Sequence, residues 1–494
     1  MSRIATTSSA ANTPEATPIL RSVGWCVLCL AVILAILFAR SFNSASILFA
    51  NDAPFGALKS QDENALSNFF GAWQPLNWLG SQQPSSLPDV TYLFFWLVGA
   101  LGYAKFYVPV ALFLLGLSAW FFFRRLGFGQ MACVLGALAA CLNTDPFSYA
   151  CWGLAPISVC MAAIFAGLGF LAPKLGDKGK GWAQLALAGL CVGFSIMEGY
   201  DTGAILSLFV AAFVLFQALV EKGAPGPRLA KGVGRVALVA LLAAFMAAQA
   251  LSTLIGTQLK GIVGAQQDPN TKEKRWIEAT MWSLPKIETL RVIIPGLFGY
   301  RMDTPNGGNY WGAVGQVPGV PQSRHSGSGV YAGVLVALVA AWGIARSAQP
   351  RGGPFTAQER RFIWFWAGAA LVSLLLAYGR HAPFYQFFYK LPYFSTIRNP
   401  VKFMHPFSIA LVTLFGYGLE GLWRSYLQKN LLKSGSITAQ LNAWWQAVPR
   451  FERRWTIGSI IALAAPALGW LHAGKDQYEN PVHRAAERPL FCDG

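Results

Sequence analysis

The stretch from 107 to 143 reads YVPVALFLLGLSAWFFFRRLGFGQMACVLGALAACLN, two apolar runs separated by a short segment with two arginines and two glycines. A helix needs roughly 20 apolar residues to cross the hydrocarbon core of a bilayer. Charges and glycines between such runs typically mark a turn at the membrane surface. We therefore expect helices at 105–123 and 129–142, joined by a turn that holds Arg124 and Arg125.

Similar apolar runs recur along the whole chain. Of its 494 residues, 54% are hydrophobic and only 12% are charged, which is too apolar for an ordinary soluble protein. The sequence predicts an all-α polytopic membrane protein with about eleven transmembrane helices. Beside the two above, they are expected at 22–40, 154–172, 182–198, 203–220, 233–255, 330–346, 362–379, 404–422 and 456–472. The segment 90–103, VTYLFFWLVGALGY, is short for a span and apolar for a loop, so we expect a re-entrant or interfacial helix there.

The basic residues predict the topology. If 90–103 does not cross the membrane, one side collects the loops FFFRRLG, PKLGDKGKGW, EKGAPGPRLAKGVGR and RSAQPRGGPFTAQERR, with a large excess of Lys and Arg. On the other side the two signs nearly balance. The positive-inside rule then places the N-terminus in the cytoplasm. The net charge of +17 therefore reports topology, and no dense basic run with interleaved aromatics indicates a nucleic-acid partner.

The predicted organisation has four parts. They are a disordered cytoplasmic N-terminus (1–20), a transmembrane domain (21–425), a basic cytoplasmic loop (426–455) and a last span with a short outer tail (456–494). The long loops at 41–104, 256–329 and 380–403 all fall on the outer side, and binding and catalytic residues are disproportionately found on such loops.

Asp52 lies in the stretch FANDAPFGALKSQDENA, directly after the first apolar run. It is either the solvated end of a helix or a carboxylate held at the membrane surface for chemistry. Asp62 and Glu63 in the same stretch are interpreted as solvated charges. A second acidic pair, Glu198 and Asp201 in IMEGYDTGA, lies at a predicted outer turn, where it either is hydrated or faces the same cavity as Asp52.

The last outer loop, YGRHAPFYQFFYKLPYFSTIRNPVKF, interleaves basic and aromatic residues. Such residues often only anchor a helix at the interface, and Lys390 is interpreted in this way. Arg398 and Lys402 flank RNPVK at the start of a helix, a place that suits a phosphate group. Arg380 and His381 are further candidates in this loop.

The loop over 256–329 ends in a Gly-rich half, where Tyr310 either stacks on a sugar ring or anchors the loop at the interface. The sequence has no P-loop, dinucleotide fingerprint, HExxH, GxSxG or EF-hand pattern. His325 and His381 are isolated, so the residues themselves do not predict a metal site.

An acidic residue after the first span, then QPLNWLG, the stretch 107–143, LRVIIPGLFGY, NYWG and LPYFSTIRNPVKFMHPFSIALVTLFGYGLEGL follow one another in the chain. In this order of features the chain resembles the YfhO-like bacterial membrane proteins of the GT-C glycosyltransferase superfamily. The resemblance covers about 20–425, and its motifs are diffuse. It implies a GT-C-like fold in a bacterial inner membrane, and transfer of a sugar from a polyprenyl-phosphate donor in the membrane lipid to a glycan or protein acceptor outside the cell. YfhO-like chains are often longer, and NDAPFG departs from the strict Asp context of better-known members.

The resemblance also implies roles for individual residues. Asp52 matches the acidic position of the first outer loop and would act as a base, which favours direct displacement with inversion. Arg398 and Lys402 would hold the lipid phosphate. Glu198 or Asp201 would orient the acceptor or bind Mg²⁺ or Mn²⁺. The rival expectation is a non-catalytic protein, either a lipid-linked-sugar transporter or an envelope-assembly scaffold; a scaffold would lack a cavity that joins Asp52 to Arg398.

Overall fold

The computed structural model describes residues 19–48, 50–62, 73–74, 81–82, 89–172, 181–254, 269–298, 310, 312–316, 329–349, 353–391, 394–427 and 437–473. The predicted N-terminal tail up to residue 18, most of the predicted loop 256–329 with His325, and Glu63 lie outside these residues. Within them the chain is helical, apart from β1 (Trp73–Gln74) and β2 (Ser81–Gln82), which pair antiparallel. The prediction of an all-α membrane protein is confirmed.

The first half of the chain contains α1 (Ile19–Leu37), η1 (Ala39–Phe42), α2 (Phe55–Asp62), α4 (Val90–Arg125), α5 (Gln130–Cys141), α6 (Thr144–Tyr149), η2 (Ala150–Leu154), α7 (Pro156–Leu171), α8 (Gly181–Glu198), α9 (Tyr200–Leu219), α10 (Pro225–Met246) and α11 (Ala248–Leu254). The second half contains α12 (Pro269–Thr280), η5 (Lys286–Val292), α13 (Val334–Ser347), α14 (Ala357–Ala377), η6 (Gly379–His381), α15 (Phe384–Tyr389), η7 (Phe394–Thr396), η8 (Pro400–Phe403), α16 (Met404–Leu422), η9 (Trp423–Leu427), α18 (Ile437–Ala447) and α19 (Arg450–Ala473).

Six helical segments of the described residues are long and apolar enough to cross a membrane. They are Val90–Arg125, Gln130–Leu154, Gly181–Glu198, Tyr200–Leu219, Pro225–Met246 and Ala357–Ala377. Ser22–Leu37, Pro156–Leu171 and Val334–Ser347 are apolar but shorter. The chain is therefore a multi-pass membrane protein, but the predicted number of eleven spans is not confirmed.

Two predicted boundaries differ from the structure. The short helix predicted at 90–103 ends earlier, at Gly99, whose non-helical φ of 68° is accessible mainly to glycine; α4 (Val90–Arg125) therefore consists of two helical segments joined at this kink. The span predicted at 233–255 begins earlier, at Pro225, and breaks near Ala247 before α11. Proline at the first helical position favours this early start.

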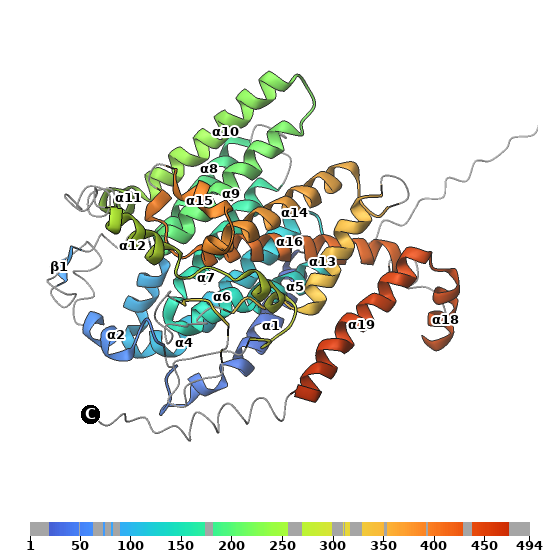
Figure 1. Ribbon diagram of the computed structural model, residues 1–494, viewed down its shortest axis with the longest axis horizontal. Helices are drawn as coiled ribbons and strands as arrows, with labels where there is room; N and C mark the ends of the chain where they lie inside the picture. The colour runs from blue at the N-terminus through green and yellow to red at the C-terminus, as the bar shows by residue number, and fades with distance from the viewer. Residues whose placement is uncertain are drawn as a thin grey trace, which may run out of the picture.

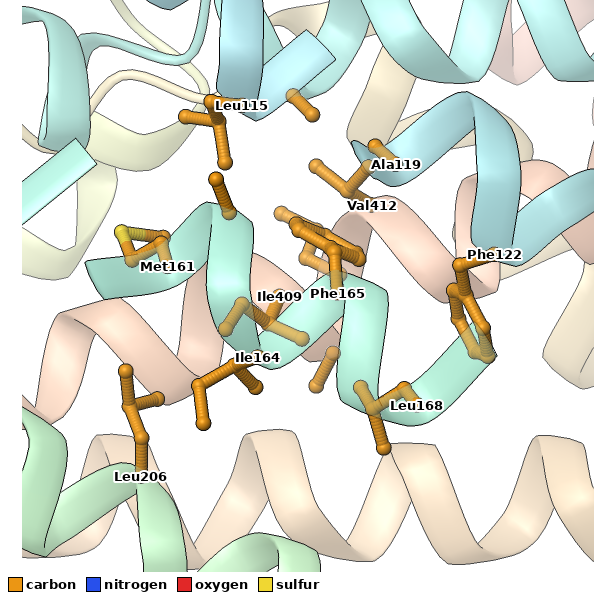
Figure 2. Close-up of a cluster of buried hydrophobic side chains, with 14 of the residues drawn as sticks. Leu115, Ala119, Phe122, Met161, Ile164, Phe165, Leu168, Leu206, Ile409 and Val412 are labelled. Carbon is orange, nitrogen blue, oxygen red and sulfur yellow. The ribbon is translucent and has the colours of Figure 1, made fainter. Parts of the chain in front are cut away.

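The core of the bundle forms where α4, α7, α9 and α16 meet. Figure 2 shows Leu115, Phe122, Phe165, Leu206 and Ile409 pointing toward one another from these helices. Helix α7 packs against both α4 and α8, and helix α16 packs against α13 and α14. In Figure 1, α10 lies at one outer edge of this arrangement and α19 at another. These contacts fix the ends of the helices from which the candidate site is built.

Candidate functional site

A cavity of about 590 Å³ lies where five separate parts of the chain meet. It brings together Asp52 of the segment between η1 and α2, Glu198 and Asp201 at the adjoining ends of α8 and α9, and Lys402 of η8. The remaining lining residues are Asn51, Tyr149, Trp152, Leu154, Pro156, Ile157, Gly199, Thr202, Trp282 and Asn399. The cavity therefore combines three carboxylates and one lysine with an aromatic and aliphatic wall, as small-molecule sites commonly do.

Asp52 is held in the cavity by the backbone of η2. Its N–H donates to the carbonyl of Trp152 at 3.0 Å, and the side-chain amide of Asn51 donates to its Oδ1 at 3.1 Å. The next residue of η2, Gly153, has a φ of 113°, and a Cβ added there would come within 2.7 Å of the Ala53 nitrogen. Glycine is therefore needed for this close approach. Asp52 itself lines the cavity and is an exposed residue.

Lys402 reaches the cavity from η8 and forms an ion pair with Asp201. The turn that carries it is fixed at both sides, because the Asn399 N–H donates to the Ala279 carbonyl at 2.8 Å and the Val401 N–H to the Trp282 carbonyl at 2.9 Å. Asn399 has a φ of 66°, a left-handed conformation that asparagine tolerates better than most residues. An ammonium group has three donors, so Lys402 can hold Asp201 and still bind an anion.

Glu198 is 7% exposed and accepts hydrogen bonds from the first residues of α4. Its Oε1 accepts from the N–H groups of Val90 at 2.7 Å and Thr91 at 3.3 Å, and its Oε2 accepts from the Thr91 hydroxyl. Asp89, directly before α4, accepts from the Tyr92 N–H at 2.9 Å, and burial raises the pKa of its carboxyl to about 6. A carboxylate at a helix N-terminus is favourably placed, so Glu198 ties α8 to α4 at the edge of the cavity.

A buried pair that the sequence analysis did not predict lies beside the cavity. Asp145 of α6 and His405 of α16 are joined by a 2.9 Å contact between Oδ2 and Nδ1, and both side chains are almost completely buried. The His405 ring packs at 4.9 Å against the ring of Tyr149, which lines the cavity. The sequence signal for this pair was a histidine inside the apolar segment predicted at 404–422, where an ionisable group is usually retained for a reason.

Four predicted residues do not line this cavity. Arg398 is exposed. Arg380 lies in η6, where its guanidinium donates to the Gln316 carbonyl and its N–H to the Ser283 hydroxyl at 3.1 Å. Burial, reinforced by the charge of Arg380, lowers the pKa of His381.

Tyr310, the fourth of these residues, is only 3% exposed. Its hydroxyl donates to the Glu288 carboxylate at 2.7 Å and accepts from the Val314 N–H at 2.9 Å. Glu288 also accepts from Arg291 at 3.0 Å. These hydrogen bonds connect the loop before α13 to η5. The Tyr310 ring does not line the cavity, so it does not offer a stacking surface there.

No three His, Cys, Asp or Glu side chains of the described residues lie close enough together to share a metal ion. In the cavity, Glu198 is engaged by the start of α4 and Asp201 by Lys402. With these partners, Glu198 and Asp201 do not fit Mg²⁺ or Mn²⁺.

No protein-family model matches the chain, and no curated protein matches it. Two solved structures are similar at 14% sequence identity and a TM-score of 0.45. One is the archaeal oligosaccharyltransferase AglB from Archaeoglobus fulgidus in complex with an inhibitory peptide and a dolichol-phosphate; the match covers 95% of this chain and 60% of that one. The other is an Archaeoglobus fulgidus oligosaccharyltransferase tethered to an acceptor peptide, with 90% and 54% covered. The chain thus spans 60% and 54% of these two structures, less than two thirds of either, and these values do not establish a common family.

Proposed function

We propose that this chain is a GT-C-type glycosyltransferase that moves a sugar from a polyprenyl-phosphate donor to an acceptor hydroxyl on the outer face of the membrane. The observation that carries the proposal is the meeting of Asp52 and Lys402 in one cavity, beside the adjoining ends of α8 and α9. A base and a cation in one site are what glycosyl transfer from a phosphate carrier requires. The sequence resemblance to YfhO-like proteins supports the same function.

The reaction would be a direct displacement at the sugar carbon that bears the phosphate. Asp52 accepts the proton of the acceptor hydroxyl as its oxygen forms the new bond to that carbon. The bond between this carbon and the phosphate oxygen breaks, and the electron pair leaves with the polyprenyl phosphate. Lys402 offsets the negative charge that develops on the leaving phosphate, and Asp201 keeps the ammonium group directed into the cavity.

The sequence predicted that Arg398 and Lys402 together would hold the lipid phosphate. We assign this role to Lys402, because only Lys402 of the two lines the cavity. The scaffold alternative expected no cavity that joins Asp52 to Arg398, and Arg398 does not line the cavity, whereas Lys402 of the same loop does. The cavity that Asp52 and Lys402 share supports an enzyme in which Lys402, and not Arg398, binds the phosphate. A transporter would need ionisable groups near the middle of paired, broken helices, whereas the acidic residues of this cavity lie at helix ends.

The proposal is tested by supplying the purified chain with radiolabelled polyprenyl-phosphate sugars and a membrane-glycan acceptor. Asp52→Asn should lower the transfer rate by about 100-fold or more, as expected when a general base is removed. Asp62→Asn is the matched control, because Asp62 follows Asp52 by ten residues, pairs with Lys59 at 3.8 Å and does not line the cavity. Equal transfer rates for both variants, with unchanged melting temperatures, would refute the role of Asp52.

Lys402 is tested separately through the donor. Lys402→Gln should raise the KM for the polyprenyl-phosphate sugar, because the phosphate loses its cation. Lys390→Gln removes an exposed lysine of the same loop that does not line the cavity, and it should leave this KM unchanged. A KM that responds equally to both substitutions would mean that the loop acts only through its overall charge.

A further inference from the structure

A second, larger groove of about 980 Å³ lies between α9, α13 and α14. It is at the end of the bundle opposite the candidate site. Helix α9 starts at Tyr200, beside the cavity, and its 20 residues span roughly 30 Å before Leu219. The start of α14 lies at this far end, since Arg361 donates to the carbonyl of Val220 at 3.2 Å. The groove is therefore near the other surface of the membrane.

The wall of this groove is apolar and open to one side. The rings of Phe216 and Phe365 stack at 4.8 Å and form part of it, and Trp364 at its edge is 52% exposed. Gly368 of α14 leaves a gap in the wall, because a Cβ added there would have no atom within 4 Å. Helices α9 and α14 are long and apolar enough to cross the membrane, so an open groove along them lies against lipid chains.

One end of the groove is positively charged. Arg360 and Arg361 both line it, and no acidic side chain is among its lining residues in the described part of the chain. The adjacent Glu359 is engaged elsewhere, by Arg424 at 2.9 Å and by the N-terminus of α14. Arg361 is exposed, and a guanidinium has five N–H donors, of which the bond to the Val220 carbonyl uses one. Its geometry suits a phosphate.

We propose that this groove binds one anionic glycerophospholipid of the surrounding bilayer, with an acyl chain along Phe216 and Gly368 and the phosphate at Arg361. The charge of the groove and its depth in the membrane select this occupant over a zwitterionic lipid, whose choline group would lie near two arginines. An arginine near a membrane surface contributes about 1 kcal/mol to the binding of anionic lipid. The site is separate from the candidate glycosyltransferase cavity and does not depend on its function.

The test is native mass spectrometry of the full chain in detergent, titrated with phosphatidylglycerol and with phosphatidylcholine. The natural chain should bind one phosphatidylglycerol more tightly than phosphatidylcholine. Arg361→Gln should weaken phosphatidylglycerol binding about fivefold, the factor that corresponds to one arginine. Arg228→Gln is the control, because Arg228 also lies at this end of the bundle and donates to carbonyls, those of Leu219 and Glu221, but is half-buried and lies outside the groove.

A second pair of variants tests the groove itself. Gly368→Leu should fill the gap and weaken binding of both lipids, whereas Gly234→Leu on the exposed face of α10 has equally open surroundings and should leave binding unchanged. Melting temperatures show whether each variant is folded. Equal affinity for the two lipids in the natural chain, or equal effects of Arg361→Gln and Arg228→Gln, would overturn the phosphate site. Undiminished binding in folded Gly368→Leu would overturn the placement of the acyl chain.

Discussion

Gly153→Ala should disturb the candidate site without touching any of its charged groups. Gly153 has a φ of 113°, and the Cβ of an alanine would lie 2.7 Å from the Ala53 nitrogen, whereas ordinary contacts begin near 3.4 Å. The segment that carries Asp52 must therefore move by about 0.7 Å, the difference between these two distances, or the turn itself must open. Either movement weakens the bond from the Asp52 N–H to the Trp152 carbonyl.

The magnitude follows from two effects. The positive φ costs about 1–3 kcal/mol of stability for a residue with a side chain. A displacement approaching 1 Å can lower the rate of a reaction by about 100-fold when it moves a group that acts on the substrate. Gly223→Ala separates the two effects, because Gly223 also has a positive φ, of 129°, but a Cβ there would have no atom within 4 Å.

The assay compares both variants in the labelled-sugar transfer reaction and in thermal unfolding. Both should lose some stability, but only Gly153→Ala should lose transfer, by roughly 10-fold to 100-fold. If the transfer rates of the two folded variants agree within about twofold, Gly153 does not position Asp52 and the reasoning is refuted.

Three further predictions concern other parts of the structure. His405→Ala should lower the free energy of unfolding by about 3–5 kcal/mol, because it leaves the buried Asp145 without its partner; a chemical denaturation curve that moves by less than about 1 kcal/mol would contradict the pairing. Glu198→Ala should lower stability by about 1–2 kcal/mol through loss of the acceptor at the start of α4, and Glu198→Gln, which keeps an acceptor oxygen, should lose less. For His381, the lowered pKa means that the folded state takes up a proton less readily than the unfolded chain, so stability is lost as the pH falls through the unfolded value of about 6.5. The melting temperature of the natural chain should therefore fall more between about pH 7 and about pH 5 than that of His381→Gln, and parallel curves would contradict this.

Much of the helical organisation could be predicted from the sequence. The helices near 105–123, 182–198 and 404–422 are found close to their predicted places, because apolar length and flanking charges are local properties. The errors occur where local signals are weak. The bend of α4 at Gly99 and the early start of α10 at Pro225 depend on backbone geometry that hydropathy does not report.

The candidate site was predictable in part for the same reason. Asp52, Glu198, Asp201 and Lys402 could be named because each is an ionisable residue at the end of an apolar run. The sequence could suggest that they share a cavity but could not establish it, since the cavity depends on how the helices pack. Arg398, four residues before Lys402, has the same local signal but faces outward.

The sequence by itself determined that this is a multi-pass helical membrane protein with acidic and basic residues at the helix ends. It did so because a bilayer imposes a length and a polarity on every segment that crosses it, and both can be read along the chain. Only the tertiary structure decided which of those residues share a cavity, that Gly153 holds the backbone beside Asp52, and that Asp145 and His405 pair beside it. These features come from contacts between segments far apart in the chain, and such contacts depend on the shapes of packed helix faces, which no local pattern encodes.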